Sequence, residues 1–206
     1  MISYLPSPTP YQEVNDFLGQ LLARLYALLG EHLVGLYIGG SLALRAFNLS
    51  RSDIDFLVVT FDHLPSDVVS GLQDLHTQLC VTHSKWALKL DGSYIPRKVV
   101  RHWTADHPPC PFVEGNQFQI TKQGSAVIQR HIIREHGVII VGPDPHDLIE
   151  PVSTDEMRVA LHDMVETWWR PELDNPSWVM QTQNQPSKLR NWTMRIDLAL
   201  SGEPRK

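Results

Sequence analysis

The chain has few cysteines, no long apolar run and no basic tract. Only two of its 206 residues are cysteines, and Cys80 and Cys110 form no disulfide or metal-binding pattern, so we expect reduced thiols. No apolar stretch approaches the roughly 20 residues that a membrane-spanning helix needs, and no basic-then-apolar signal pattern begins the chain. We therefore expect a cytoplasmic protein with no membrane partner.

Positive charge is also scarce. The 18 Lys and Arg residues are outnumbered by 23 Asp and Glu residues, which gives a formal net charge of −5, and no basic run exceeds two residues. Because nucleic-acid binding depends on basic side chains that neutralise phosphates, we expect no nucleic-acid partner. The hydrophobic content of 42% and charged content of 20% are typical of an ordinary globular protein with one sizeable core. The sequence does not indicate an oligomeric state.

Residues 36–59 carry the strongest functional pattern. An apolar strand ending at Ile38 is followed by the turn Gly39-Gly40-Ser41, a short helix, a polar loop and a second strand that begins Asp53-Ile54-Asp55. Residues two apart on a strand face the same way, so both carboxylates can converge on hard divalent cations. The turn offers backbone N–H groups at a helix start, where an anion is favoured. Either element alone is often only a solvated acid pair or a turn, but their ordered combination favours a metal site beside a phosphate cradle.

The spacing of apolar and turn-forming residues predicts an α/β chain in two parts. A capping box at Thr9–Gln12 and helical spacing from Val14 to Leu29 predict a first helix. The same reading gives strands at 34–38, 53–60 and 85–90, helices through 46, at 65–79 and at 125–135, and a surface loop over the site at 102–116. A second capping box, Ser153–Glu156, begins a helical region whose last helix starts at Ser187. We expect a catalytic domain at 1–146 and a helical domain at 151–206.

The order Gly40-Ser41, spacer, Ser52-Asp53-Ile54-Asp55 resembles the signature of the polymerase-beta-type nucleotidyltransferase superfamily. Within it the chain is most similar to the aminoglycoside adenylyltransferases of the streptomycin/spectinomycin type and their uncharacterised relatives. Residues 90–96 look like that family's strand with the third carboxylate, 129–145 like its helix–strand join, and 194–203 like a helix of its C-terminal domain. The resemblance implies an α+β nucleotidyltransferase fold, with a small mixed sheet flanked by helices and a short C-terminal helical domain.

The resemblance also implies an activity and a set of site residues. The expected reaction is magnesium-dependent transfer of AMP from ATP to a hydroxyl of a small molecule, with release of pyrophosphate. Two Mg²⁺ ions are expected at Asp53, Asp55 and Asp91, with Asp91 acting either as the general base or as a metal ligand. The positions expected to bind the nucleotide are Gly40, Ser41, Ser52, Arg195 and Lys206.

Three departures from the family pattern bear on the acceptor. Asp91 stands where these adenylyltransferases usually have glutamate. Gln181 and Gln185 stand where acids hold a cationic aminoglycoside, and neutral amides cannot supply that charge pairing. The resemblance also implies a helical domain that runs beyond residue 206, so we expect this domain to be shortened here, either naturally or because its far end is missing. Two alternatives therefore stay open: a protein-modifying nucleotidyltransferase or antitoxin, and a nucleotide-binding relative with reduced catalysis.

Overall fold

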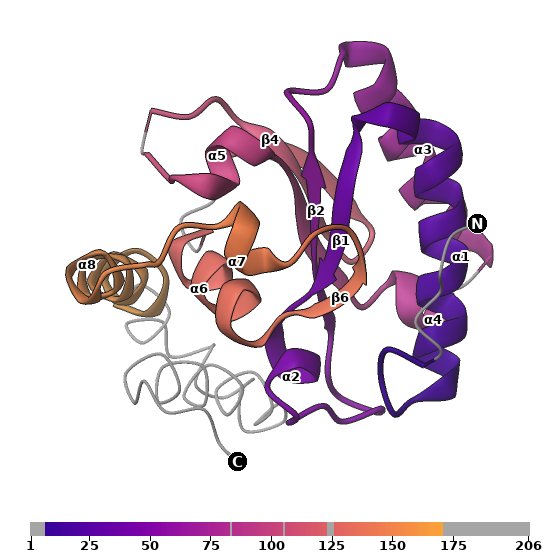
Figure 1. Cartoon of the computed structure of the whole chain (residues 1–206). Coiled ribbons are helices and arrows are strands. Elements are labelled where there is room, and N and C mark those ends of the chain that lie inside the picture. The colour runs from indigo at the N-terminus through magenta and orange to yellow at the C-terminus, as the bar shows by residue number, and fades with distance from the viewer. Residues whose placement is uncertain (1–6, 83, 105, 123–125, 171–206) are drawn as a thin grey trace.

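The computed structural model describes residues 7–170 apart from 83, 105 and 123–125 (Figure 1). These residues form a six-stranded mixed sheet in the order β5-β4-β3-β2-β1-β6. β2 and β3 are parallel, and the other neighbouring pairs are antiparallel. The bounds of the strands are β1 Leu33–Ile38, β2 Ile54–Thr60, β3 Leu90–Pro96, β4 Cys110–Glu114, β5 Gln117–Thr121 and β6 Val138–Val141. The expected mixed sheet with flanking helices is confirmed.

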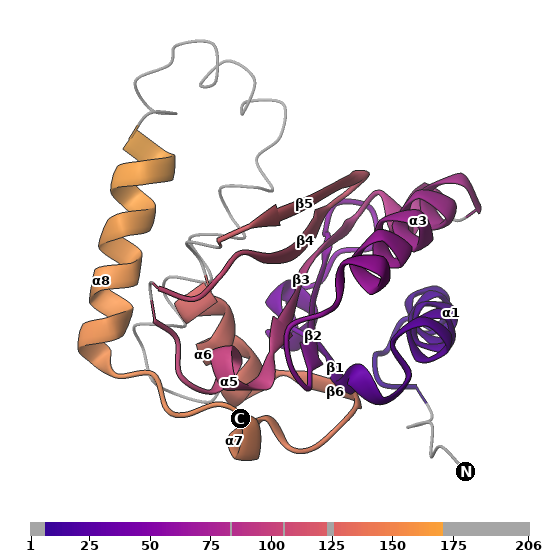
Figure 2. The same cartoon turned by 90° about the horizontal axis from the view of Figure 1, so that it is seen from above.

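Helices cover both faces of the sheet. Figure 2 shows α1 (Gln12–Leu29) and α3 (Ser66–Thr82) on one face, and α5 (Arg97–Arg101) and α6 (Ala126–His136) on the other. The remaining helical segments are η1 Gly30–His32, α2 Gly40–Ala43, α4 Ser84–Ala87, α7 Pro145–Leu148, α8 Thr154–Met164 and η2 Val165–Trp169. In the described part of the chain, no helix is both long and apolar enough to cross a membrane.

Alternation along β2 sorts its side chains between two apolar clusters. Phe56 and Val58 belong to the larger cluster, with the buried side of α1 and with Leu72 of α3. Leu57 and Val59 face the other way, into a smaller cluster that includes Ile133 of α6. Since residues of one strand point alternately to opposite faces, Asp55 shares the α6 side of the sheet with Leu57 and Val59.

Two of the helix starts test the capping-box predictions. The box at Ser153–Glu156 is confirmed, because the Ser153 side chain accepts from the Glu156 N–H and the Glu156 side chain accepts from the Ser153 N–H. The box at Thr9 is wrong, because α1 begins only at Gln12. Thr9 instead hydrogen-bonds the Asn15 side chain, with 2.7 Å between Thr9 Oγ1 and Asn15 Oδ1.

The third strand begins later than its apolar pattern predicts. Residues 84–87 form α4 rather than a strand, and β3 starts at Leu90. Trp86 and Ala87 are both buried against the larger cluster. Adjacent buried residues suit a helical turn better than a strand that is solvated on one face, so tertiary packing overrides the alternation.

The loop predicted at 102–116 is confirmed in part. Residues 110–114 form β4 instead, whereas 102–104, 106–109 and the turn at 115–116 contain no helix or strand. β4 is antiparallel to β3, with Glu114 opposite Asp91 and Phe112 opposite Ser93. Residues 106–109 therefore lie toward the far end of β3 from Asp91, and of the described residues in this segment the turn at 115–116 follows the residue that pairs with Asp91.

The C-terminal region is described only as far as Arg170. α8 packs on α6, with Met157 and Ala160 against Ile128 and Ile132. The division into domains at 1–146 and 151–206 stays a prediction. The helix expected from Ser187 lies outside the described residues.

Candidate functional site

Three aspartates meet at the amino ends of β2 and β3. Asp55 and Asp91 are direct partners in the parallel register of these strands, so their side chains lie next to each other on the α6 side of the sheet. Asp53 precedes Asp55 by two residues and continues the same face. One carboxylate oxygen from each residue lies within 4.8 Å of the other two. The structure thus brings together the three acids that the sequence analysis singled out as metal ligands.

The oxygen cluster fits a divalent metal ion. Mg²⁺ binds carboxylate oxygens at about 2.1 Å, so two oxygens on one ion lie up to roughly 4.2 Å apart, which small side-chain rotations would achieve. Among the described residues, buried Asp53 Oδ1 has no hydrogen-bond partner. A buried carboxylate oxygen without a partner is costly, and a bound cation would remove that cost.

The glycine-serine turn lies directly beside this cluster. The Gly39 N–H donates to the Asp55 carbonyl oxygen at 2.9 Å, which ties the end of β1 to the start of β2. Gly40 has φ +52°, in the left-handed region that favours glycine. Ser41 is 4% exposed, and its hydroxyl has no hydrogen-bond partner in the described structure. α2 is a single turn and ends at Ala43, shorter than the predicted helix through 46, so any phosphate contact here depends on individual N–H groups and the Ser41 hydroxyl.

Ser52 has a structural role in the loop before Asp53. Its side chain is buried, its Oγ accepts from the Asn48 N–H at 3.0 Å, and its own N–H donates to the Asn48 carbonyl oxygen at 2.8 Å. These two hydrogen bonds close the loop at 48–52 and so fix the position of Asp53, which follows it. The nucleotide contact expected of Ser52 stays a prediction.

Gly92 allows β2 and β3 to approach closely at the site. A Cβ at this position would lie 2.1 Å from the Phe56 carbonyl oxygen, so no larger residue fits without displacing the strands. The Gln129 side chain of α6 donates to that same carbonyl at 3.3 Å. The pairing of Asp55 with Asp91 therefore depends on glycine at position 92. The α6 helix covers the sheet at this point.

Two charged residues near the three aspartates were not among the site residues expected from the sequence. Glu114 is the register partner of Asp91 on β4. Lys89 immediately precedes β3, and its carbonyl oxygen accepts from the N–H of Ile54, the residue after Asp53, at 2.7 Å. Lys89 could have been found from its spacing, since it precedes Asp91 by two residues, as Asp53 precedes Asp55. Glu114 could not, because the composition of residues 102–116 predicts a loop.

The remaining expected site residues lie beyond the described part of the chain. These are Arg195 and Lys206, predicted to contact the triphosphate, and Gln181 and Gln185, which replace acids of the resembled family. Their expected roles stay predictions.

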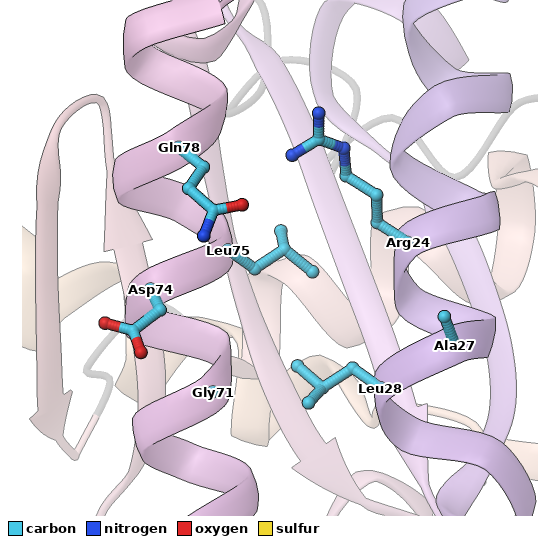
Figure 3. Close-up of a pocket in the computed structure, with 7 residues that line it drawn as sticks. All are labelled: Arg24, Ala27, Leu28, Gly71, Asp74, Leu75 and Gln78. Carbon is cyan, nitrogen blue, oxygen red and sulfur yellow. The ribbon is translucent and has the colours of Figure 1, made fainter.

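A separate groove lies between α1 and α3, with a volume of about 480 Å³ (Figure 3). Arg24 comes from α1 and Asp74 from α3, and Leu28 and Leu75 contribute apolar surface. The groove is on the opposite face of the sheet from Asp55, and it brings no group of potential metal ligands together. The three aspartates are therefore the candidate site.

The six-stranded mixed sheet with its flanking helices has a nucleotidyltransferase fold, as the resemblance predicted. Among solved structures, the chain is similar to the spectinomycin adenyltransferase AAD(9) from Enterococcus faecialis, crystallised with ATP and spectinomycin, with a TM-score of 0.58 and 18% sequence identity. The similarity covers 78% of this chain and 67% of that one. No protein-family model and no curated protein matches the chain.

Two toxin–antitoxin structures are more distant. A toxin–antitoxin structure with AMP-PNP has a TM-score of 0.34 and 10% identity, and covers 80% of this chain and 97% of its own. The tri-AMPylated HEPN toxin of Shewanella oneidensis in complex with the MNT antitoxin has a TM-score of 0.35 and 14% identity, over 76% of this chain and 92% of that one. These similarities are too weak to inform the fold or to favour an antitoxin.

Proposed function

We propose that the chain is a magnesium-dependent nucleotidyltransferase that transfers AMP from ATP to a hydroxyl group of a small molecule and releases pyrophosphate. The observation that carries this proposal is the cluster of Asp53, Asp55 and Asp91, with one oxygen from each within 4.8 Å of the others. The likeness in fold to an adenyltransferase crystallised with ATP and spectinomycin supports it.

Each site residue has a role in this proposal. Asp53 and Asp55 would hold Mg²⁺, which when bound stabilises charge on the attacking and leaving oxygens. Gly40 and Ser41 would approach the phosphates from the turn beside Asp55, since the buried Ser41 hydroxyl has no partner within the described residues. Asp91 lies opposite Asp55, where its carboxylate can complete the metal site or accept the proton of the acceptor hydroxyl.

The test is a transfer assay with ATP labelled on its α-phosphate against a panel of aminoglycosides, sugars and nucleosides. We expect label on one acceptor class, pyrophosphate as the second product, and no transfer without Mg²⁺. Asp55→Asn should lower turnover by more than the roughly 10²–10⁴-fold that loss of a general base costs, because it removes metal binding itself. Asp74→Asn is the matched control, since Asp74 lies on the opposite face of the sheet.

Equal turnover in the wild type and Asp55→Asn would contradict the proposal, as would transfer that persists after removal of divalent metal. The two roles of Asp91 are separated by Asp91→Asn. If Asp91 is a metal ligand, this variant should bind Mn²⁺ more weakly than the wild type. If Asp91 is the general base, the variant should keep its Mn²⁺ affinity and lose roughly 10²–10⁴-fold in turnover.

A further inference from the structure

Lys89 is a cation at the edge of an otherwise acidic site. Asp55 pairs with Asp91, and Asp53 and Lys89 are the residues just before the first pair of the two strands, Ile54 and Leu90. Three of these four residues are therefore aspartates, and the fourth is a lysine. Neighbouring strands lie about 4.8 Å apart, so the stem of Lys89 starts close to the metal-binding acids.

A neighbouring lysine on the same tryptophan ring provides a direct comparison. The ammonium groups of Lys85 and Lys89 lie 4.6 Å and 5.3 Å from the centre of the Trp86 ring. Lys85 is neutralised by Glu13, with 2.6 Å between Lys85 Nζ and Glu13 Oε2. Lys89 Nζ instead lies 3.3 Å from the Leu49 carbonyl oxygen, and it forms no ion pair with a described carboxylate.

The ammonium of Lys89 is close to another cation. The positive charge of Lys85 disfavours the charged form of Lys89, while the negative charges of Asp53 and Glu13 favour it. When Asp53 binds a metal ion, its negative charge is taken up by that ion. An anionic ligand that reached Lys89 would then supply an ion pair in place of the neutral Leu49 carbonyl.

We propose that Lys89 binds the polyphosphate of the nucleotide, with its ammonium moving from the Leu49 carbonyl to an oxygen of the β- or γ-phosphate. The inference rests on the proposed function and deepens it, because it places the leaving pyrophosphate on the Asp53 side of the site. The four-carbon stem of lysine is flexible enough for this movement, and its ammonium is a compact charge suited to phosphate. Lys89 thus acts as a positioning residue for the leaving group.

The experiment measures binding of ATP and of AMP in the presence of Mg²⁺, by calorimetry, for the full chain and four variants. Lys89→Met should weaken ATP binding by about ten- to a hundredfold, because a hydrogen bond between charged groups is lost. AMP lacks the β- and γ-phosphates, so its affinity should not change. Lys85→Met is the matched control and should bind ATP like the wild type, and Lys89→Arg should retain affinity within about threefold, because it keeps the charge.

The outcomes separate this inference from the proposed function. If the wild type binds no ATP with Mg²⁺, the proposed function itself fails. If the wild type binds ATP and Lys89→Met binds it equally well, only the role of Lys89 is refuted. Equal weakening of ATP and AMP binding, or equal weakening in Lys85→Met, would also refute it, because either result points to a general structural or electrostatic effect. A melting temperature near that of the wild type shows that Lys89→Met is folded, and Lys89→Gln provides a second neutral variant.

Discussion

The cluster of three aspartates should cost stability when no metal is bound. Two unit charges 4.8 Å apart repel by about 3 kcal/mol at an effective dielectric constant of about 20. Asp53 is partly exposed, so solvent and salt screen its repulsion, and the lost attraction to Lys89 offsets part of the gain. We therefore expect Asp53→Asn to raise the free energy of unfolding by about 1–2 kcal/mol in metal-free, low-salt buffer, and the melting temperature by about 3–6 °C.

Magnesium should make the wild type more stable than Asp53→Asn. A ligand that binds only the folded chain stabilises it by about 2.7 kcal/mol at a hundred times its dissociation constant. The wild type should gain this stabilisation and Asp53→Asn should not, so the two melting temperatures should cross as Mg²⁺ is added. Differential scanning fluorimetry with a Mg²⁺ titration measures both effects, with Asp74→Asn as the control that follows the wild type. A variant that is less stable than the wild type without metal, or that gains equally from Mg²⁺, would refute the reasoning.

Three further predictions concern the framework of the site. Buried His76 has a pKa lowered by burial to about 4, and its Nε2 lies 2.7 Å from the Tyr94 hydroxyl. His76 takes up a proton near pH 6.5 in the unfolded chain but only near pH 4 in the folded chain. The free energy of unfolding should therefore fall by about 3 kcal/mol as the pH is lowered from 6.5 to 4. Urea titrations should show that His76→Gln lacks this component, and an unchanged pH profile would contradict it. Gly92→Ala should cost at least about 3 kcal/mol, because its Cβ overlaps the Phe56 carbonyl, and near-normal stability would show that the strands can separate. Ser52→Ala should cost about 1 kcal/mol in thermal unfolding, and no loss would mean that the 48–52 loop closes without the Ser52 hydroxyl.

The elements around the first two aspartates could be predicted because local signals agreed with the fold. β1 ends at Ile38 and β2 starts at Ile54, each within one residue of the prediction. The glycine turn and the polar loop between them have the residue types that such turns require, and Gly40 adopts the positive φ that its position demands. Pattern and packing give the same answer here, so the spacing of Asp53 and Asp55 could be used directly.

The strand that carries Asp91 was accessible only through the resemblance. Residues 90–96 contain Gly92 and Pro96, which have low strand propensity, so the apolar pattern predicts the strand at 85–90 instead. β3 forms there because Gly92 accepts the close approach of the Phe56 backbone. That requirement depends on a neighbouring strand, and no local pattern of residues 90–96 expresses it.

A proline also explains why β4 could not be predicted from the sequence. Pro111 lies in a segment rich in proline and histidine, which indicates a loop. In the structure Pro111 pairs with Ile120 of β5, but it lies outside the three residues of β4 that pair with β3. Its missing N–H therefore removes no hydrogen bond on that side, where a central strand would need one. The proximity of Glu114 to Asp91 follows from this pairing and could not be read from the sequence.

The most direct test of the account is a crystal structure of the full chain with Mg²⁺ and a nonhydrolysable ATP analogue. We predict electron density for a cation bonded to oxygens of Asp53 and Asp55 and to the triphosphate, at distances of about 2.1 Å. A nucleotide bound elsewhere, with the carboxylates of Asp53, Asp55 and Asp91 facing only solvent, would contradict the central claim.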